Sequence, residues 1–294
     1  MKSPNMKDVI ATYSIVAADP ENDELGIAVQ SKFLAVGNAV PWAKAGVGAV
    51  ATQSWANTSF GPRGLELLEK GHTPQEALNI LLEDDGKKEY RQVGIVDAKG
   101  NAASFTGKEC FPWAGGVTGE NYACQGNILV NEETVTQMAE VFEKSQGDLA
   151  SRLLEALDAA QDAGGDSRGM QSAAILVVKP EGGYGGFNDR FIDLRVDDHP
   201  NPIKELMRIY DLHKLYFTKT DPDRIRKIEG DVEKKIAKAL IQLDYFQGAY
   251  SGNWTEELQE ALKTYYLTEN FDDRIAEDGY IDGDVLDFMM NQVK

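Results

Sequence analysis

The chain is poor in the residues from which most metal sites and charge-relay sites are built. Its 294 residues include two cysteines, Cys110 and Cys124, and three histidines. Two cysteines are too few for a disulfide framework or a zinc cluster, so we expect buried free thiols in a reducing compartment. The segment Asp197–His199 allows either a metal corner or a helix-capping turn before Pro200, and the turn is favoured because no second ligand cluster accompanies it.

Long apolar runs and basic residues are also scarce. No apolar run approaches the roughly 20 residues that span a bilayer, and residues 1–11 lack the apolar core of an export signal. The 48 acidic residues against 30 basic ones give a net charge of −18, which repels phosphate backbones and anionic lipid surfaces. We therefore expect a cytoplasmic protein with neither nucleic acid nor a membrane as a partner.

The sequence pattern places a hydroxyl at the start of the first strand. Thr12 opens the apolar run Thr-Tyr-Ser-Ile-Val-Ala-Ala-Asp, which turns at residues 20–23 and returns as a second strand over residues 25–33. If the peptide bond between Ala11 and Thr12 were cut, Thr12 would carry a free α-amine with a pKa of about 8. That amine could serve as the general base for the hydroxyl of the same residue, without any histidine.

Strands and helices then follow in a definite order. Further strands are predicted at 45–54, 91–97, 102–106, 122–127, 172–178 and 187–196, and helices at 64–70, from Thr73 onward, at 131–145 and at 148–162. Runs of strands separated by pairs of helices indicate largely antiparallel sheets with helices packed outside them. The predicted class is α+β, and a four-layer αββα sandwich fits the pattern.

Several ungapped blocks over residues 11–215 resemble the domain of unknown function 1028 family. They are Thr-Tyr-Ser-Ile-Val-Ala, Leu-Gly-Ile-Ala-Val-Gln-Ser-Lys-Phe-Leu-Ala-Val-Gly, Arg-Gln-Val-Gly, Gln-Gly-Asn, Ala-Gly-Gly-Asp-Ser-Arg-Gly-Met-Gln-Ser-Ala-Ala and Leu-Arg-Val-Asp-Asp-His-Pro. The resemblance implies the N-terminal nucleophile hydrolase fold, an αββα sandwich like the proteasome β subunit. It does not imply a particular substrate.

The position of Thr12 departs from the pattern of that family. Members typically carry threonine directly after the initiator methionine, whereas eleven residues precede Thr12 here. Two alternatives follow. Either the chain cleaves itself before Thr12, as some hydrolases of this fold do, or Thr12 stays blocked and is an ordinary β-branched residue at the start of a strand.

Polar residues at neighbouring strand ends complete the predicted site. A cation at Lys32 would lower the pKa of a nearby amine, although a solvated strand-end lysine is the simpler interpretation. Gln53, Ser54 and Asn57 follow the third strand, where the resemblance places a substrate groove and an oxyanion-hole amide, and a polar turn is the alternative. Gln125–Asn127 suits either a site wall or a loop.

The loop from Asp166 to Ser172 is the densest polar segment. By the same resemblance, Asp166 and Ser172 would orient the nucleophile, while Arg168 could instead form an ion pair that only fixes the loop. The predicted catalytic residues are Thr12, Lys32, Asp166 and Ser172, and the predicted substrate-binding residues are Gln30, Gln53, Ser54, Asn57, Asn127 and Arg168. No metal or other cofactor is expected.

The composition changes after Tyr216, and we expect domains at 1–217, with 1–11 as a leader, and at 218–294. The second segment resembles the peptidoglycan-binding domain appended to some members of the same family, through Ile241-Gln-Leu, Tyr250-Ser-Gly-Asn-Trp254 and Ile281-Asp-Gly. Tyr250 and Trp254 are either core residues, which is favoured, or a platform for a sugar. Without an export signal, a helical cap or a dimer contact is preferred to a glycan binder.

Two hypotheses of function follow. In the first, the protein is a self-processed N-terminal-threonine amidohydrolase that acts on a small amide or N-acyl substrate. In the second, the fold is a non-catalytic binding or assembly module with a blocked Thr12. The partners expected are a small-molecule amide, a second copy of the chain in a homo-oligomer, and a peptidoglycan fragment at the C-terminal domain.

Overall fold

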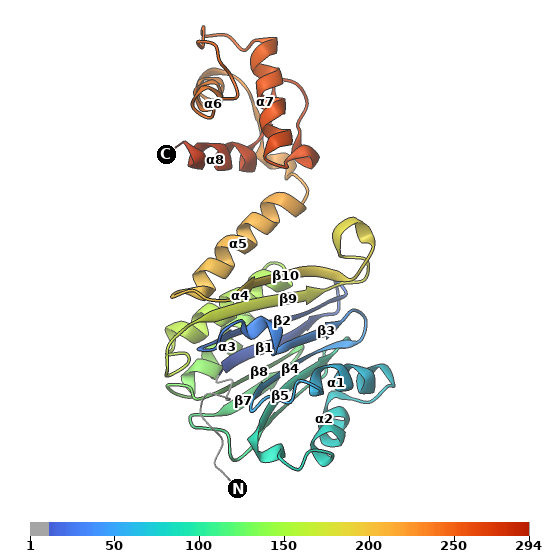
Figure 1. Cartoon of the computed structure of the whole chain (residues 1–294). Coiled ribbons are helices and arrows are strands. Elements are labelled where there is room, and N and C mark those ends of the chain that lie inside the picture. The colour runs from blue at the N-terminus through green and yellow to red at the C-terminus, as the bar shows by residue number, and fades with distance from the viewer. Residues whose placement is uncertain (1–11, 294) are drawn as a thin grey trace. The chain divides into compact units, whose positions relative to one another are not determined.

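The computed structural model describes residues 12–293, so the proposed leader and Ala11 lie outside the described residues. The chain divides into two compact units, one ending at Ile209 and one running from Tyr210 to Lys294. In Figure 1 the first unit runs from blue to yellow and the second from orange to red. Each unit has its own core and is described by itself.

A six-stranded antiparallel sheet carries the start of the chain. Its strands are β1 (Thr12–Asp19), β2 (Glu24–Ser31), β7 (Gly115–Gly119), β8 (Tyr122–Asn127), β9 (Ser172–Val178) and β10 (Arg190–Val196). The order across the sheet is β10-β9-β2-β1-β8-β7, so β1 and β2 occupy the centre (Figure 1). Both central strands are apolar and nearly fully buried along their length, as expected when both faces of a sheet are covered.

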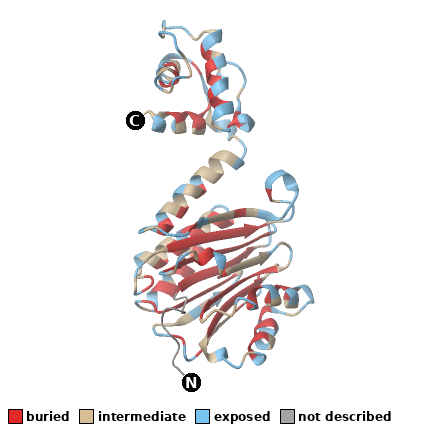
Figure 2. Ribbon diagram, viewed as in Figure 1, coloured by how far each residue is buried: buried red, intermediate tan, exposed pale blue. Residues whose placement is uncertain are grey.

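A second antiparallel sheet packs face to face with the first. It contains β3 (Pro41–Lys44), β4 (Gly48–Ser54), β5 (Arg91–Asp97) and β6 (Ala102–Thr106), in the order β3-β4-β5-β6. The core between the two sheets includes Val16, Ile27 and Val29 from one side and Ala49 and Ala51 from the other. Strand β4 is completely buried and β5 almost so, as the red ribbon in Figure 2 shows, whereas β3 and β6 are largely of intermediate burial.

Helices cover the outer face of each sheet. Helices α1 (Phe60–Glu69) and α2 (Pro74–Glu83) contact the four-stranded sheet, and α3 (Glu133–Lys144) and α4 (Leu149–Asp162) contact the six-stranded sheet. The predicted helix start at Thr73 is confirmed, because its hydroxyl accepts the Glu76 N–H in a capping box. The predicted mixed class with antiparallel sheets is confirmed as well.

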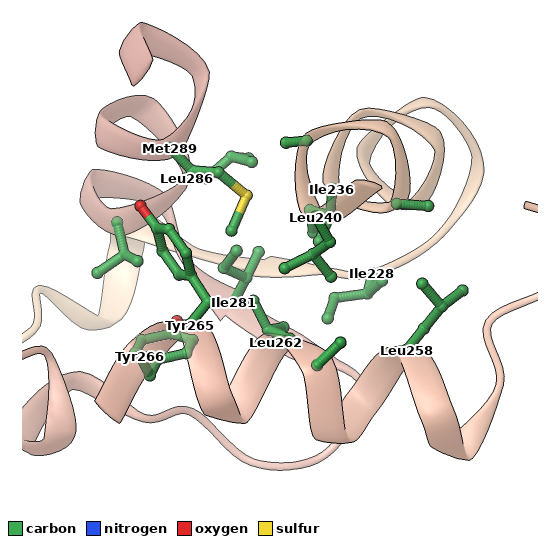
Figure 3. Packing of buried hydrophobic residues seen from close by; sticks show 14 of the residues in the cluster. Ile228, Ile236, Leu240, Leu258, Leu262, Tyr265, Tyr266, Ile281, Leu286 and Met289 are labelled. Carbon is green, nitrogen blue, oxygen red and sulfur yellow. The ribbon is translucent and has the colours of Figure 1, made fainter. Parts of the chain in front are cut away.

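Helix α5 (Pro202–Phe217) leads into the C-terminal unit, which is largely helical as predicted. Its further elements are β11 (Ile225–Lys227), α6 (Gly230–Gln242), α7 (Glu256–Thr268), β12 (Tyr280–Asp282) and α8 (Gly283–Gln292). Figure 3 shows its core, in which Leu240 of α6, Leu262 and Tyr265 of α7 and Met289 of α8 converge. Short 3-10 segments lie at Val36–Asn38, Lys88–Tyr90, Tyr184–Gly186, Pro222–Arg224 and Asp272–Arg274.

The cysteines and the lengths of the helices can be compared with the sequence. Cys110 and Cys124 are buried free thiols, as predicted; Cys110 lies in the loop after β6 and Cys124 in β8. Among residues 12–293, no helix combines the length and the apolar character needed to cross a membrane.

Candidate functional site

A row of four polar residues crosses the six-stranded sheet at the end where β1 begins. Thr12 pairs with Ser31 of β2 and with Asn127 of β8, and Ser31 pairs in turn with Ser172 of β9. All four are buried. Since paired residues of adjacent strands point to the same face, the four side chains share the face that packs on the second sheet. The Thr12 hydroxyl donates a hydrogen bond to Ser31 Oγ at 3.0 Å.

Amide side chains from the second sheet meet this row. Gln53 of β4 donates through Nε2 to the Thr12 carbonyl at 3.3 Å and to Gln92 Oε1 at 2.9 Å. Its Oε1 accepts the Ser14 hydroxyl at 2.6 Å. Asn127 Nδ2 also donates to Gln92 Oε1, at 2.9 Å. The network therefore fixes the backbone of Thr12 with groups that carry no charge at any ordinary pH.

Two acceptors in this network have no hydrogen-bond partner in the described chain. They are Gln125 Oε1 and Asn127 Oδ1, both on buried residues of β8. The other end of the Gln125 amide donates to Ser14 Oγ at 2.7 Å. Because an unpaired buried acceptor costs free energy, each such atom calls for a physical explanation.

The predicted loop from Asp166 to Ser172 lies beside the row. The Asp166 carboxylate accepts the backbone N–H of Lys32 at 3.0 Å, directly after the strand residue that pairs with Thr12. It also accepts Arg168 Nη2 at 2.9 Å and is completely buried. The structure thus forms the Arg168–Asp166 ion pair that the sequence offered as an alternative, and the carboxylate ties the loop to the end of β2.

Lys32 and Ser172 have structural contacts of their own. The exposed Lys32 side chain donates through Nζ to the Met170 carbonyl at 3.0 Å. The Ser172 hydroxyl accepts the Val36 N–H at 3.1 Å and donates to the Phe33 carbonyl. Both residues hold the segment that follows β2 against the start of β9 and the loop before it. Both also adjoin Ser31, because Lys32 follows it in the chain and Ser172 pairs with it.

The predicted groove residues after β4 divide into two groups. Gln53 reaches Thr12, whereas Asn57 Nδ2 donates to Asp85 Oδ2 at 3.2 Å and Asn57 Oδ1 accepts the Ser59 hydroxyl at 2.7 Å. Asn57 therefore has the contacts of the polar turn that was the alternative. Ser54 between them is buried and has a left-handed φ of 64°, which is uncommon for a residue with a side chain.

A buried ion pair supports this end of β4. Arg91 Nε donates to Asp85 Oδ2 at 2.7 Å, and Arg91 Nη1 donates to the Trp55 carbonyl. Burial favours the neutral form of Asp85, but hydrogen bonds from Arg91, from the Lys87 N–H and from Asn57 outweigh it. Together they lower the pKa of the Asp85 carboxyl to about 2.

Gln30 lies on the other face of the sheet. It pairs with Tyr13, whose hydroxyl donates to Gln161 of α4 at 2.9 Å, so both residues point towards the helices. The Gln30 side chain is fully buried, and neither of its polar atoms has a hydrogen-bond partner among the described residues. The sheet separates it from the Thr12 hydroxyl.

Metal-ligand geometry is not found in residues 12–293, where no group of three histidine, cysteine or acidic side chains could hold an ion. At the candidate metal corner, His199 Nδ1 accepts the Asn201 N–H at 3.0 Å, directly before α5 begins at Pro202. The His199 side chain is thus used in a local turn before the helix.

Three residues of the site were not singled out from the sequence: Ser14, Ser31 and Gln92. Ser14 and Ser31 could have been found, because strand alternation and a short turn place them on the face of Thr12. Gln92 carries no such signal. Its contact with Asn127 depends on the packing of one sheet on the other.

The fold and the site define a protein of two stacked antiparallel sheets with a buried threonine-centred polar site between them. The chain belongs to the family of unknown function DUF1028, whose model matches residues 12–206. The family model "Putative peptidoglycan binding domain" matches residues 216–289. Both matches confirm the two resemblances seen in the sequence.

Solved structures extend the comparison. The crystal structure of the DUF1028 protein SPO2555 from Silicibacter pomeroyi is 36% identical, with a TM-score of 0.64, and the alignment covers 69% of this chain and 86% of that chain. Anbu (ancestral beta-subunit) from Yersinia bercovieri matches at 11% identity and a TM-score of 0.32, over 68% of this chain and 94% of that chain, which does not establish a shared fold. No curated protein matches the chain.

In the C-terminal unit, the two candidate sugar-platform residues pack against the core. Tyr250 and Trp254 are partly buried on the cluster that contains Leu258. The Tyr250 hydroxyl donates to Glu233 Oε1 at 2.7 Å, and Trp254 Nε1 donates to Gln259 Oε1 at 2.9 Å. Their polar atoms are thus used inside the unit, as the favoured core interpretation expects.

Proposed function

We propose that this protein is an N-terminal-threonine amidohydrolase that becomes active when the chain is cleaved before Thr12. One observation carries the proposal. The Thr12 hydroxyl stands at the first position of the first strand, hydrogen-bonded to Ser31 and enclosed by uncharged amides. In the proposal the general base for the hydroxyl is the α-amine of Thr12 itself, which requires no imidazole.

The chemistry follows from that pairing. The α-amine takes the Oγ1 proton as Oγ1 attacks the substrate carbonyl, and a tetrahedral intermediate with an oxyanion forms. The resulting ammonium gives its proton to the departing amine as the C–N bond breaks. Water, deprotonated by the same amine, then hydrolyses the acyl ester on Thr12 and releases a carboxylic acid. The substrate class is a small amide or an N-acyl compound.

The arrangement of layers supports this proposal. Helices α1 and α2 cover one sheet, α3 and α4 cover the other, and the first residue of the central strand β1 faces the space between the sheets. In the proposal these layers correspond to the four-layer αββα sandwich of N-terminal nucleophile hydrolases. The family match also begins at Thr12.

The surrounding residues have supporting parts in this proposal. Lys32, Asp166, Arg168 and Ser172 hold the loop before β9 against the end of β2, which fixes Ser31 beside the nucleophile. Gln53 contacts Thr12 from the facing sheet, and Asn127 pairs with Thr12 in the neighbouring strand. Ser54 and Asn57 shape the turn beyond Gln53. Gln30 supports the sheet from the helix side and does not touch the substrate.

An oxyanion donor is available next to Ser54. Trp55 Nε1 is a buried donor with no hydrogen-bond partner among the described residues, and the Trp55 side chain packs on Ile128, which directly follows Asn127. A preorganised N–H of this kind is what a developing oxyanion requires. In the proposal, Trp55 Nε1 takes this role, because both hydrogens of the Gln53 amide have interior acceptors.

Two measurements test the function. Intact mass shows whether residues 1–11 are removed, and a screen of small amides and N-acyl amino acids compares the wild type with Thr12→Ala. We expect the wild type to lack residues 1–11, and we expect Thr12→Ala to have no activity. Activity should be unchanged with Thr118→Ala, an exposed strand threonine of β7. A full-length protein that is active, or activity indifferent to Thr12→Ala, contradicts the proposal. A full-length, inactive protein favours the non-catalytic binding or assembly module.

A second function is favoured by the match of residues 216–289 to a peptidoglycan-binding family. We propose that this unit binds a peptidoglycan fragment at its surface pocket of about 460 Å³, which Ile275 and Tyr280 line with partly exposed apolar surface. Sedimentation with purified peptidoglycan tests this. Tyr280→Ala should abolish co-sedimentation and Leu267→Ala, exposed on α7 outside the pocket, should preserve it. Equal behaviour of the two variants contradicts the proposal.

A further inference from the structure

The surrounding amides determine which atom of the Asn127 side chain has no hydrogen-bond partner in the described chain. Gln92 Nε2 donates to the Gly126 carbonyl at 2.7 Å and to Thr106 Oγ1 at 2.9 Å, so Gln92 Oε1 must be the accepting atom. Asn127 therefore turns its Nδ2 to Gln92, at 2.9 Å. Its Oδ1 is the atom left over, buried and without a partner in the described chain. Gln92 thus determines which atom of Asn127 is free.

The register of β1 and β8 shows that the backbone nitrogen of Thr12 points at Asn127. Ala18 N donates to the Asn121 carbonyl at 2.8 Å, and hydrogen-bonded pairs recur at every second residue of an antiparallel ladder. Counting back along β1, Ser14–Gln125 and Thr12–Asn127 are pairs of the same kind. The backbone N atom of Thr12 therefore points at Asn127. On the other side of β1, Thr12 and Ser31 form a non-hydrogen-bonded pair, in which side chains lie closer together, and the Thr12 hydroxyl donates to Ser31 Oγ.

We propose that Asn127 is the positioning residue for the Thr12 α-amine, with Oδ1 accepting a hydrogen bond from that amine. This inference rests on the proposed function, since only a cleaved chain has the amine. A neutral amine has two N–H groups and one lone pair. One N–H group is directed at the backbone carbonyl of Asn127 and the other at Asn127 Oδ1. The lone pair then remains to accept the proton of Thr12 Oγ1. Asn127 Oδ1, which has no partner in the described precursor, gains a donor when the chain is cleaved.

The charges around the amine suit this role. Strands β4, β5 and β8 present only the neutral amides Gln53, Gln92 and Gln125 towards it. The charged groups around the site include Asp166, Arg168 and Lys32, at the loop before β9 and the end of β2, and the Asp85–Arg91 ion pair at the end of β4. A neutral acceptor orients the amine without holding it as an ammonium, as a carboxylate at this position would.

The test measures the pKa of the α-amine in the processed protein. The pH dependence of its reaction with an acylating reagent, located by mass spectrometry, gives this pKa, and the acidic limb of kcat/KM gives a second value. Asn127→Asp should raise the pKa by about one unit or more, because it places a carboxylate beside the ammonium. Asn127→Ala removes the acceptor and should lower the pKa by about 0.5 to 1 unit.

Gln125 provides the matched control. It lies two residues along β8 on the same face, and its Oε1 is also without a described partner, but it pairs with Ser14. Gln125→Ala should leave the pKa of the α-amine unchanged. If the protein is processed but Asn127→Ala leaves the pKa of the α-amine unchanged, the role of Asn127 is overturned and the proposed function is not. This outcome can be read even if Asn127→Asp does not fold. A chain that retains residues 1–11 overturns this inference together with the proposed function, and the intact mass tells the two failures apart.

Discussion

Gly94 of β5 makes room for a glutamine of the polar network. A Cβ at this position would lie 2.1 Å from Gln125 Oε1 and 2.6 Å from its Cδ, closer than real contacts allow. The Gln125 amide cannot swing away freely, because its Nε2 donates to Ser14 Oγ at 2.7 Å in a buried setting. The absence of a side chain at one residue therefore helps fix the amide opposite it.

We predict that Gly94→Ala lowers the free energy of unfolding by about 1 to 3 kcal/mol, the usual cost of overpacking a core. Chemical denaturation measures this difference. The matched control is Gly86→Ala, where an added Cβ meets nothing within 4 Å and the change should stay within about 0.5 kcal/mol. Equal midpoints for Gly94→Ala and wild type would show that Gln125 moves without cost.

Single residues also show the limits of reasoning from sequence. Thr12 and Lys32 could be placed near each other because one short turn joins their strands. Alternation along β2 would equally have separated Gln30 from the face of Thr12. By contrast, the contact of Gln53 with Thr12 depends on the packing of two sheets, which no local pattern encodes. Residues that lie on one hairpin are thus accessible to sequence reasoning, and residues that meet across the core are not.

At the scale of elements, the predicted and observed bounds agree best where local signals are complete. Strands β5, β6 and β9 begin and end where the alternation and the turn residues indicate. Strand β7 (Gly115–Gly119) is not predicted, because three of its five residues are glycines and it forms by pairing with β8. Strand β3 begins with Pro41 at a sheet edge, where proline is tolerated but gives no strand signal.

An ion pair joins Asp85, in the connection after α2, to Arg91, the first residue of β5. The side chain of Asp85 is 10% exposed, and its pKa is lowered from 3.8 to about 2. A carboxyl whose pKa is lower in the folded state contributes stability above its unfolded pKa. That contribution is about 2 kcal/mol and is lost as the pH falls from about 4 to 2.

We predict that Asp85→Asn destabilises the first unit by at least about 2 kcal/mol at pH 7, because it also leaves Arg91 without its charged partner. The difference from wild type should shrink as the pH falls from 4 to 2, which unfolding curves at several pH values can follow. Asp84→Asn is the neighbouring control, because Asp84 pairs with Arg63 but is 60% exposed, and its effect should be below about 1 kcal/mol. A difference for Asp85→Asn that is constant with pH would contradict the linkage.

At the scale of the whole molecule, the two units have separate hydrophobic cores, one between and beside the two sheets and one among α6, α7 and α8. The second core is organised around a buried ion pair, in which Arg274 Nη1 donates to Asp282 Oδ2 at 2.8 Å and both side chains are at most 3% exposed. Arg274 also donates to the carbonyls of Lys214 and Thr218 at the end of α5. One side chain thus joins three segments of the C-terminal unit.

We predict two transitions in calorimetry, because each unit can unfold around its own core. Arg274→Leu leaves the Asp282 carboxylate buried and unpaired, at a cost of about 3 to 5 kcal/mol, comparable with the whole stability of a unit of this size. It should abolish the transition of the C-terminal unit, or lower its midpoint by about 15 °C or more, and leave the other transition in place. Arg224→Leu, which removes ion pairs of a 38% exposed side chain, should shift neither transition by more than a few degrees. A single transition that moves as a whole with Arg274→Leu would mean that the two units unfold as one.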